Sequence, residues 1–88
     1  MNAVKIIMPT DGFHVLAAKQ ISGAASAFQS EIRIIWEEKN IISDAKSILG
    51  IMAMEIKKGT SLTLTFDGPD EEQAMELLIL WFEHNANN

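Results

Sequence analysis

His14 is the first residue in this chain of 88 residues whose type and position could do chemistry. It follows a turn-forming stretch, residues 9–12, and precedes a run with apolar side chains at helical spacing. The start of a helix exposes unpaired N–H groups and partial positive charge, which favours a neutral, nucleophilic imidazole and would stabilise an anion formed on it. A phosphoryl group fits this position, although His14 can also be an ordinary exposed residue that flanks the helix.

Ser47 is the second candidate, because it lies near the start of a shorter helix expected over residues 45–53. A phosphate in the first turn of a helix is stabilised by the free amides there. Its charge would also change any interface formed by the apolar neighbours, here Ile48 and Met52. The alternative is a serine at a helix start with a structural role only.

Composition and charge exclude several classes of function. Seven basic and twelve acidic residues give a net charge of −5 and a pI near 4.8, which disfavours direct binding to nucleic acid or anionic lipid. The absence of cysteine removes thiolate chemistry and disulfides and suits a reducing, cytoplasmic location. The longest apolar run, residues 77–82, is too short for membrane insertion. Because no glycine-rich phosphate loop, nucleophile elbow or metal-ligand spacing occurs, we predict no cofactor, no metal and no stand-alone enzyme.

One small domain must position these residues, because no stretch of the sequence has the composition of a linker. Apolar and alternating runs predict strands at residues 3–8, 31–37, 41–42 and 61–66. Helical spacing predicts helices over 14–28 and 45–53 and a last helix that begins near Pro69. The order β-α-β-β-α-β-α, with strands polar on one face, indicates an α+β open-faced two-layer β-sandwich: a four-stranded antiparallel sheet with three helices on one face. We expect one domain over residues 1–88, with a disordered tail at 85–88.

Side-chain patterns within these elements predict which faces are buried. In the last strand, Leu62, Leu64 and Phe66 alternate with polar residues and should face the core. Ser43 or Asp44 should cap the second helix. The expected buried stripe of the first helix is Ala17, Ile21, Ala24, Ala25 and Phe28, and that of the last helix is Ala74, Leu77, Leu78 and Trp81.

Five short motifs in order along the chain carry a resemblance to a known family. They are Gly12-Phe13-His14, Phe28-Gln29-Ser30-Glu31-Ile32, Ala45-Lys46-Ser47-Ile48-Leu49-Gly50-Ile51-Met52, Gly59-Thr60-Ser61-Leu62 and Gly68-Pro69-Asp70-Glu71-Glu72-Gln73-Ala74. Together they resemble the HPr family, the histidine-containing phosphocarriers of the bacterial sugar phosphotransferase system, over essentially the whole chain. The resemblance implies the same open-faced sandwich.

The resemblance implies a function for the loop Gly12-Phe13-His14. In the family, the active histidine accepts a phosphoryl group from enzyme I, which takes it from phosphoenolpyruvate, and passes it to sugar-transporter components of the phosphotransferase system. His14 occupies the matching position, with Gly12 and Phe13 as binding residues beside it.

The resemblance also implies regulation at Ser47, which matches the serine that an ATP-dependent HPr kinase phosphorylates in the Gram-positive branch. The phosphorylated family members act with a catabolite-control transcription factor. Ile48 and Met52 match the apolar surface that partners contact.

The active loop departs from the family pattern, in which the histidine is followed by alanine or threonine, then arginine and proline. Here Leu16 and Ala17 stand where the arginine and proline would be. An arginine can form charge-assisted hydrogen bonds to a phosphoryl group, each worth roughly 1.5–3 kcal/mol, and leucine can form none. We therefore expect impaired transfer from His14, with Lys19 or Lys5 as the lysines that could supply the missing charge.

Three functions remain open from the sequence. The first is a phosphocarrier that uses His14, and the second is a non-transferring regulatory module, similar to the catabolite-repression homologue of HPr, that acts through phosphorylated Ser47. The third is an adaptor that uses the surface of Ile48 and Met52 without phosphorylation. The first two require an accessible imidazole and an accessible hydroxyl close to one apolar patch.

Overall fold

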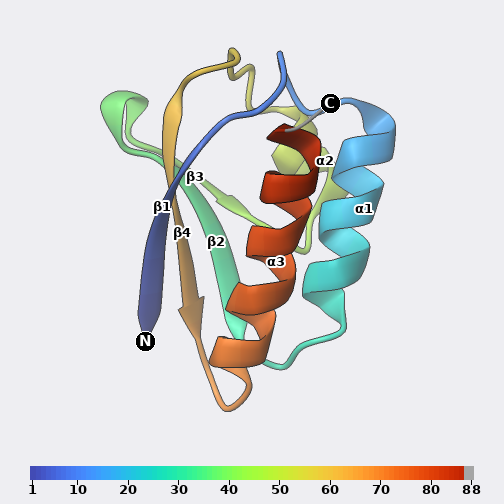
Figure 1. The fold of residues 1–88 in the computed structure, drawn as a ribbon, viewed down its shortest axis with the longest axis vertical. Coiled ribbons are helices and arrows are strands. Elements are labelled where there is room, and N and C mark those ends of the chain that lie inside the picture. The colour runs from blue at the N-terminus through green and yellow to red at the C-terminus, as the bar shows by residue number, and fades with distance from the viewer. Residues whose placement is uncertain (87–88) are drawn as a thin grey trace.

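The computed structural model describes residues 1–86 and contains the predicted elements in the predicted order (Figure 1). The strands are β1 (Asn2–Ile7), β2 (Glu31–Trp36), β3 (Ile41–Asp44) and β4 (Ser61–Asp67). The helices are α1 (Val15–Ser26), α2 (Ile48–Met52) and α3 (Glu71–Ala86), and a 3₁₀ turn, η1 (Glu37–Lys39), joins β2 to β3. The predicted α+β class is confirmed.

The four strands form one antiparallel sheet in the order β1-β4-β2-β3. Leu64 of β4 lies opposite Val4 on one side and opposite Ile34 on the other, and Ile34 in turn lies opposite Ser43. Because side chains in one row across a sheet share a face, these four residues point to the same side. Helices α1 and α3 lie next to each other on one side of the sheet (Figure 1).

The core lies between the sheet and the helices. Leu62, Leu64 and Phe66 are fully buried, so the prediction for the last strand is confirmed. The predicted helix stripes are only partly right. In α1 the buried residues are Ala18, Ile21, Ser22 and Ala25, and in α3 they are Ala74, Leu78 and Phe82. Trp81 is half-buried because its Nε1–H reaches outward and donates to Gln20 Oε1 at 2.8 Å.

Asp70 ties the start of α3 to the loop between α1 and β2. Its carboxylate accepts the N–H of Gln29 at 2.9 Å, the N–H of Ser30 at 3.0 Å and the Ser30 hydroxyl. The hydroxyl of Ser30, followed by the Gln29 N–H, holds the pKa of Asp70 below its ordinary value of 3.8. Because Gly68 packs against Ser30, a Cβ there would lie 2.6 Å from the Ser30 Cα. The loop therefore needs both a carboxylate and a glycine.

We expect Asp70→Asn to unfold at lower urea concentration near neutral pH. Each carboxylate oxygen of Asp70 accepts a backbone N–H, and the asparagine amide replaces one of these oxygens with an NH₂ group, which cannot accept it. A lowered folded pKa stabilises the fold above the ordinary value of the carboxyl group and loses that effect as the pH falls through the lowered pKa. The difference in unfolding free energy between wild type and variant should therefore shrink below about pH 4. Asp67→Asn, at an exposed carboxylate three residues away, is the matched control. A difference independent of pH would contradict this assignment.

The last helix extends into the segment that the sequence predicts to be a disordered tail, residues 85–88. Helix α3 includes Asn85 and Ala86, the first half of the segment predicted to be disordered, and residues 87–88 lie outside the described part of the chain. Among the helices of residues 1–86, none combines the length and apolar character needed to cross a bilayer.

Candidate functional site

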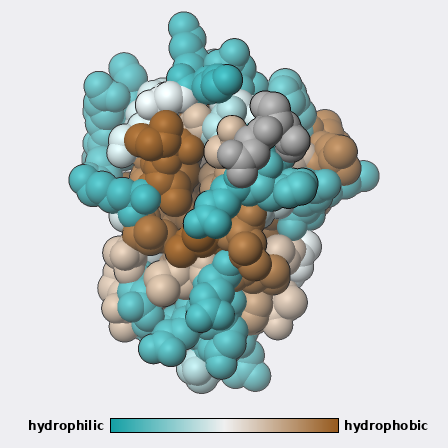
Figure 2. Space-filling view, viewed as in Figure 1, coloured by the Kyte–Doolittle hydropathy of each residue, from teal (hydrophilic) through white to brown (hydrophobic). Residues whose placement is uncertain are grey.

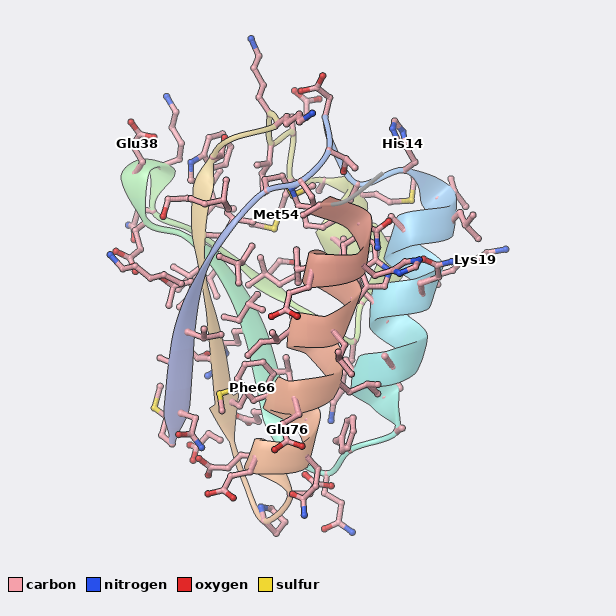
Figure 3. The ribbon with its side chains drawn as sticks, in the orientation of Figure 1. His14, Lys19, Glu38, Met54, Phe66 and Glu76 are labelled. Carbon is pink, nitrogen blue, oxygen red and sulfur yellow. The ribbon has the colours of Figure 1, made fainter. Side chains whose placement is uncertain are left out.

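His14 occupies the N-cap position of α1, and its side chain is exposed to solvent (Figure 3). Its backbone is extended, with φ −70° and ψ 166°, and its carbonyl accepts the Ala18 N–H at 2.9 Å as the helix begins. The imidazole makes no capping hydrogen bond, and the first turn holds no acidic residue. Within residues 1–86, no side chain caps the first-turn amides of this 12-residue helix, so their positive end lies beside the imidazole.

The two residues before His14 fix where it stands. Phe13 is only 5% exposed and packs in the core, so its side chain anchors the loop instead of offering an exposed contact to a partner. Gly12 has φ +76°, in the left-handed region that favours glycine, and its N–H donates to the Ile56 carbonyl at 2.7 Å. The structure thus gives Phe13 and Gly12 a positioning role in the loop, and the binding role expected for them stays a prediction.

An open cavity of about 560 Å³ lies beside His14. Its lining includes His14 and Met52, which the sequence singled out, together with Asp11, Glu55 and Lys57. The cavity thus lies between His14, the last residue of α2 and the segment that follows that helix. Sequence reasoning missed Glu55 and Lys57, because their position beside His14 depends on contacts between distant segments.

Ser47 is the N-cap of α2, and its Oγ accepts the Gly50 N–H at 3.1 Å. The prediction that Ser43 or Asp44 caps this helix is wrong. Asp44 Oδ1 instead accepts the Lys46 N–H at 2.9 Å in the turn before the helix, and the buried Ser43 Oγ has no hydrogen-bond partner among residues 1–86. The chain therefore enters the helix three residues later than the sequence predicts.

Apolar side chains are exposed along α2 and at the start of α1. Ile48 and Met52 are 37% and 39% exposed, and Leu49, which the sequence analysis missed, is 80% exposed. The spacing of these three residues along a helix was the available signal for Leu49. Val15 and Leu16 add exposed apolar area beside His14. Ser47 is half-buried next to Ile48, but it does not line the His14 cavity, which Met52 reaches from the opposite end of α2.

Neither lysine expected to replace the family arginine lies at His14. Lys19 points outward from the middle of α1, away from His14 (Figure 3). Lys5 borders a different groove, between β1 and α3, whose lining includes Ile6 and Phe82. Figure 2 shows apolar side chains gathered on that face of the molecule. The basic residue that lines the His14 cavity is Lys57.

Comparison with known proteins places this architecture in a family. The family model for the "PTS HPr component phosphorylation site" matches residues 2–84. The chain belongs to the HPr family. It is 42% identical over 67 residues to the phosphocarrier protein HPr of Lysinibacillus sphaericus, which covers 76% of this chain and 74% of that protein. It is also 44% identical over 59 residues to the HPr-like protein Crh of Halalkalibacterium halodurans, covering 67% of this chain and 68% of that one.

A solved HPr structure confirms the fold. The crystal structure of HPr-C-His from Thermoanaerobacter tengcongensis superposes with a TM-score of 0.87 at 32% sequence identity, and the match covers 100% of this chain and 98% of that one. The resemblance drawn from the five sequence motifs is therefore confirmed over residues 2–84.

Proposed function

We propose that this chain is a phosphocarrier of the phosphoenolpyruvate-dependent sugar phosphotransferase system and that His14 is its phosphoryl acceptor. Membership of the HPr family supports the reaction class. The observation that carries the choice of residue is the exposed imidazole at the uncapped start of α1. The proposed partners are enzyme I as donor and sugar-transporter components as acceptors, and the proposed location is the cytoplasm.

In the proposed step, a ring nitrogen of His14 attacks phosphorus with its lone pair. The new nitrogen–phosphorus bond forms as the bond between phosphorus and the donor atom breaks, and the electron pair of the broken bond stays on the donor. The proton on the other ring nitrogen is retained, so the step needs no general base. The phosphoryl oxygens then lie beside the first-turn amides of α1, whose positive end stabilises their charge without reorganisation. In transfer to the next carrier, a nucleophile of that carrier bonds to phosphorus, the nitrogen–phosphorus bond breaks, and its electron pair returns to the His14 ring nitrogen.

We infer slower transfer than in relatives that carry the family arginine. Leu16 stands at that position with 67% of its surface exposed, and its side chain offers no donor to a phosphoryl group. A missing charge-assisted contact worth about 1.4 kcal/mol in the transition state slows transfer about tenfold.

The second candidate function is regulation at Ser47. Ser47 is half-buried at the start of α2 and adjoins Ile48, and the similarity to an HPr-like protein Crh supports a function other than transfer. Phosphorylation by HPr kinase would replace the hydroxyl that now accepts the Gly50 N–H with a dianion at that place. The added charge beside exposed apolar side chains would then favour a different partner, such as a catabolite-control transcription factor.

Two parallel reactions test these proposals: incubation with enzyme I and labelled phosphoenolpyruvate, and incubation with HPr kinase and labelled ATP. We expect acid-labile label in the first reaction, as a phosphohistidine gives. Acid-stable label that Ser47→Ala abolishes in the second reaction would support the regulatory function. Because alanine removes a cap worth about 1 kcal/mol, Ser47→Asp, which keeps a capping oxygen, is the folding control. A chain that takes no label in either reaction would contradict both proposals and leave the adaptor.

A further inference from the structure

We infer that Lys57 provides the cationic contact for the phosphoryl group on His14, in place of the arginine that the family has at the position of Leu16. This inference rests on the proposed function of His14 as the phosphoryl acceptor. The geometry behind it is the cavity that residues His14 and Lys57 both line, with both residues exposed to solvent.

Lys57 is held beside the loop that precedes α1 by hydrogen bonds on both of its sides. The carbonyl of Ile56 accepts the Gly12 N–H at 2.7 Å. The N–H of Lys58 donates to Asp11 Oδ1 at 2.9 Å. Ile56 is 2% exposed and Lys57 is exposed, so the segment buries one side chain and presents the next to solvent. The position of Lys57 relative to the active loop is therefore fixed by the backbone, and only its side chain has to move.

The other basic side chains are placed elsewhere. Of the seven basic residues, all of which the structure describes, Lys57 alone lines the His14 cavity. Arg33 pairs with Glu31 on β2 at 3.2 Å, and Lys46 Nζ donates to the Phe28 carbonyl at 2.8 Å. In the part of the chain that the structure describes, Lys57 forms no ion pair, so its ammonium group is available to an anion.

The charges around the cavity make this ammonium group necessary. Asp11 and Glu55 line the same cavity, and both carry carboxylates. A phosphoryl group on His14 would add further negative charge at the site, and like charges in proximity raise the free energy of that state. Lys57 is the group that offsets this repulsion. Because an ammonium is a flexible point charge and a guanidinium a planar fork, we expect Lys57 to be a weaker contact than the family arginine.

The test compares Lys57→Gln with the matched control Lys58→Gln, which removes a neighbouring charge that does not line the cavity and keeps the backbone N–H bonded to Asp11. Phosphoryl transfer from phosphorylated enzyme I is followed by rapid quench, and each variant is unfolded in urea to confirm its stability. We expect Lys57→Gln to lower the transfer rate about tenfold or more, since one charge-assisted hydrogen bond is lost. Lys58→Gln should transfer at the wild-type rate, and Lys57→Arg should retain or exceed it.

The outcomes separate this inference from the proposed function. Equal rates for Lys57→Gln and Lys58→Gln, with wild type still labelled on His14, would overturn the role of Lys57 and leave the carrier function intact. Failure of Lys57→Arg to exceed Lys57→Gln would also overturn it, because a charge at that position would then not matter. Absence of label from wild type itself would overturn the proposed function.

Discussion

His14→Ala is expected to lose all acid-labile phosphorylation by enzyme I and phosphoenolpyruvate. The chain has two histidines, and alanine at position 14 removes the ring nitrogen that would bond to phosphorus. The variant should fold, because the His14 side chain is exposed and makes no capping hydrogen bond. His84→Ala on α3 is the matched control, at the other histidine, and should be labelled at the wild-type rate. The measurement is the amount of acid-labile label per chain after fixed times.

Opposite behaviour of the two histidine variants would refute the assignment. Label that persists in His14→Ala and disappears in His84→Ala would move the acceptor to α3. Circular dichroism of both variants shows whether a loss of label reflects the missing nucleophile or a loss of structure.

Leu16→Arg is expected to raise the transfer rate about ten- to hundredfold, because it restores a guanidinium able to form charge-assisted hydrogen bonds to the phosphoryl group. The side chain at position 16 is 67% exposed at the first turn of α1, so the substitution buries no charge. Leu80→Arg is the control, because Leu80 is 59% exposed on α3 and lines neither of the two cavities that His14 borders. The rate of phosphoryl transfer from enzyme I checks this result.

Equal acceleration by the two arginine variants would contradict a direct contact between the side chain at position 16 and the phosphoryl group, since net charge and encounter rate would then explain the effect. Measuring the effect of Leu16→Arg on the transfer rate in the Lys57→Gln variant tests whether the two cations contact the same phosphoryl group. If the two cations serve one phosphoryl group, the gain from Leu16→Arg should be larger when Lys57 is absent, because neighbouring groups with a shared partner are not additive.

The parts of the fold that follow from local pattern could be predicted from the sequence. Leu62, Leu64 and Phe66 alternate with polar residues, and this alternation predicts a strand with one buried face. The buried stripe of α1 was harder to predict. Alanines at positions 17, 18, 24 and 25 give little contrast between faces, so packing against the other helices decided that Ala18 and Ser22 are buried.

The site also has one part that could be predicted from local sequence pattern and another that could not. The place of His14 at the start of a helix follows from the turn residues and the helical spacing after it. Lys57 and the cap by Ser47 do not follow from local pattern. The first depends on hydrogen bonds between the loop before α1 and the segment around residue 57, and the second depends on an Asp44 side chain that turns back to its own loop. The Lys58–Asp11 bond joins segments 47 residues apart, whereas the Asp44 and Ser47 bonds are local and the sequence offers several polar residues that could have formed the cap.

NMR on protein with isotope-labelled histidine rings, after incubation with enzyme I and phosphoenolpyruvate, shows which atom carries the phosphoryl group. We expect a phosphorus–nitrogen coupling to one ring nitrogen of His14, with the ring signals of His84 unchanged. A coupling to His84, or phosphorus bound to an oxygen of Ser47, would contradict the assignment of His14 as the phosphoryl acceptor.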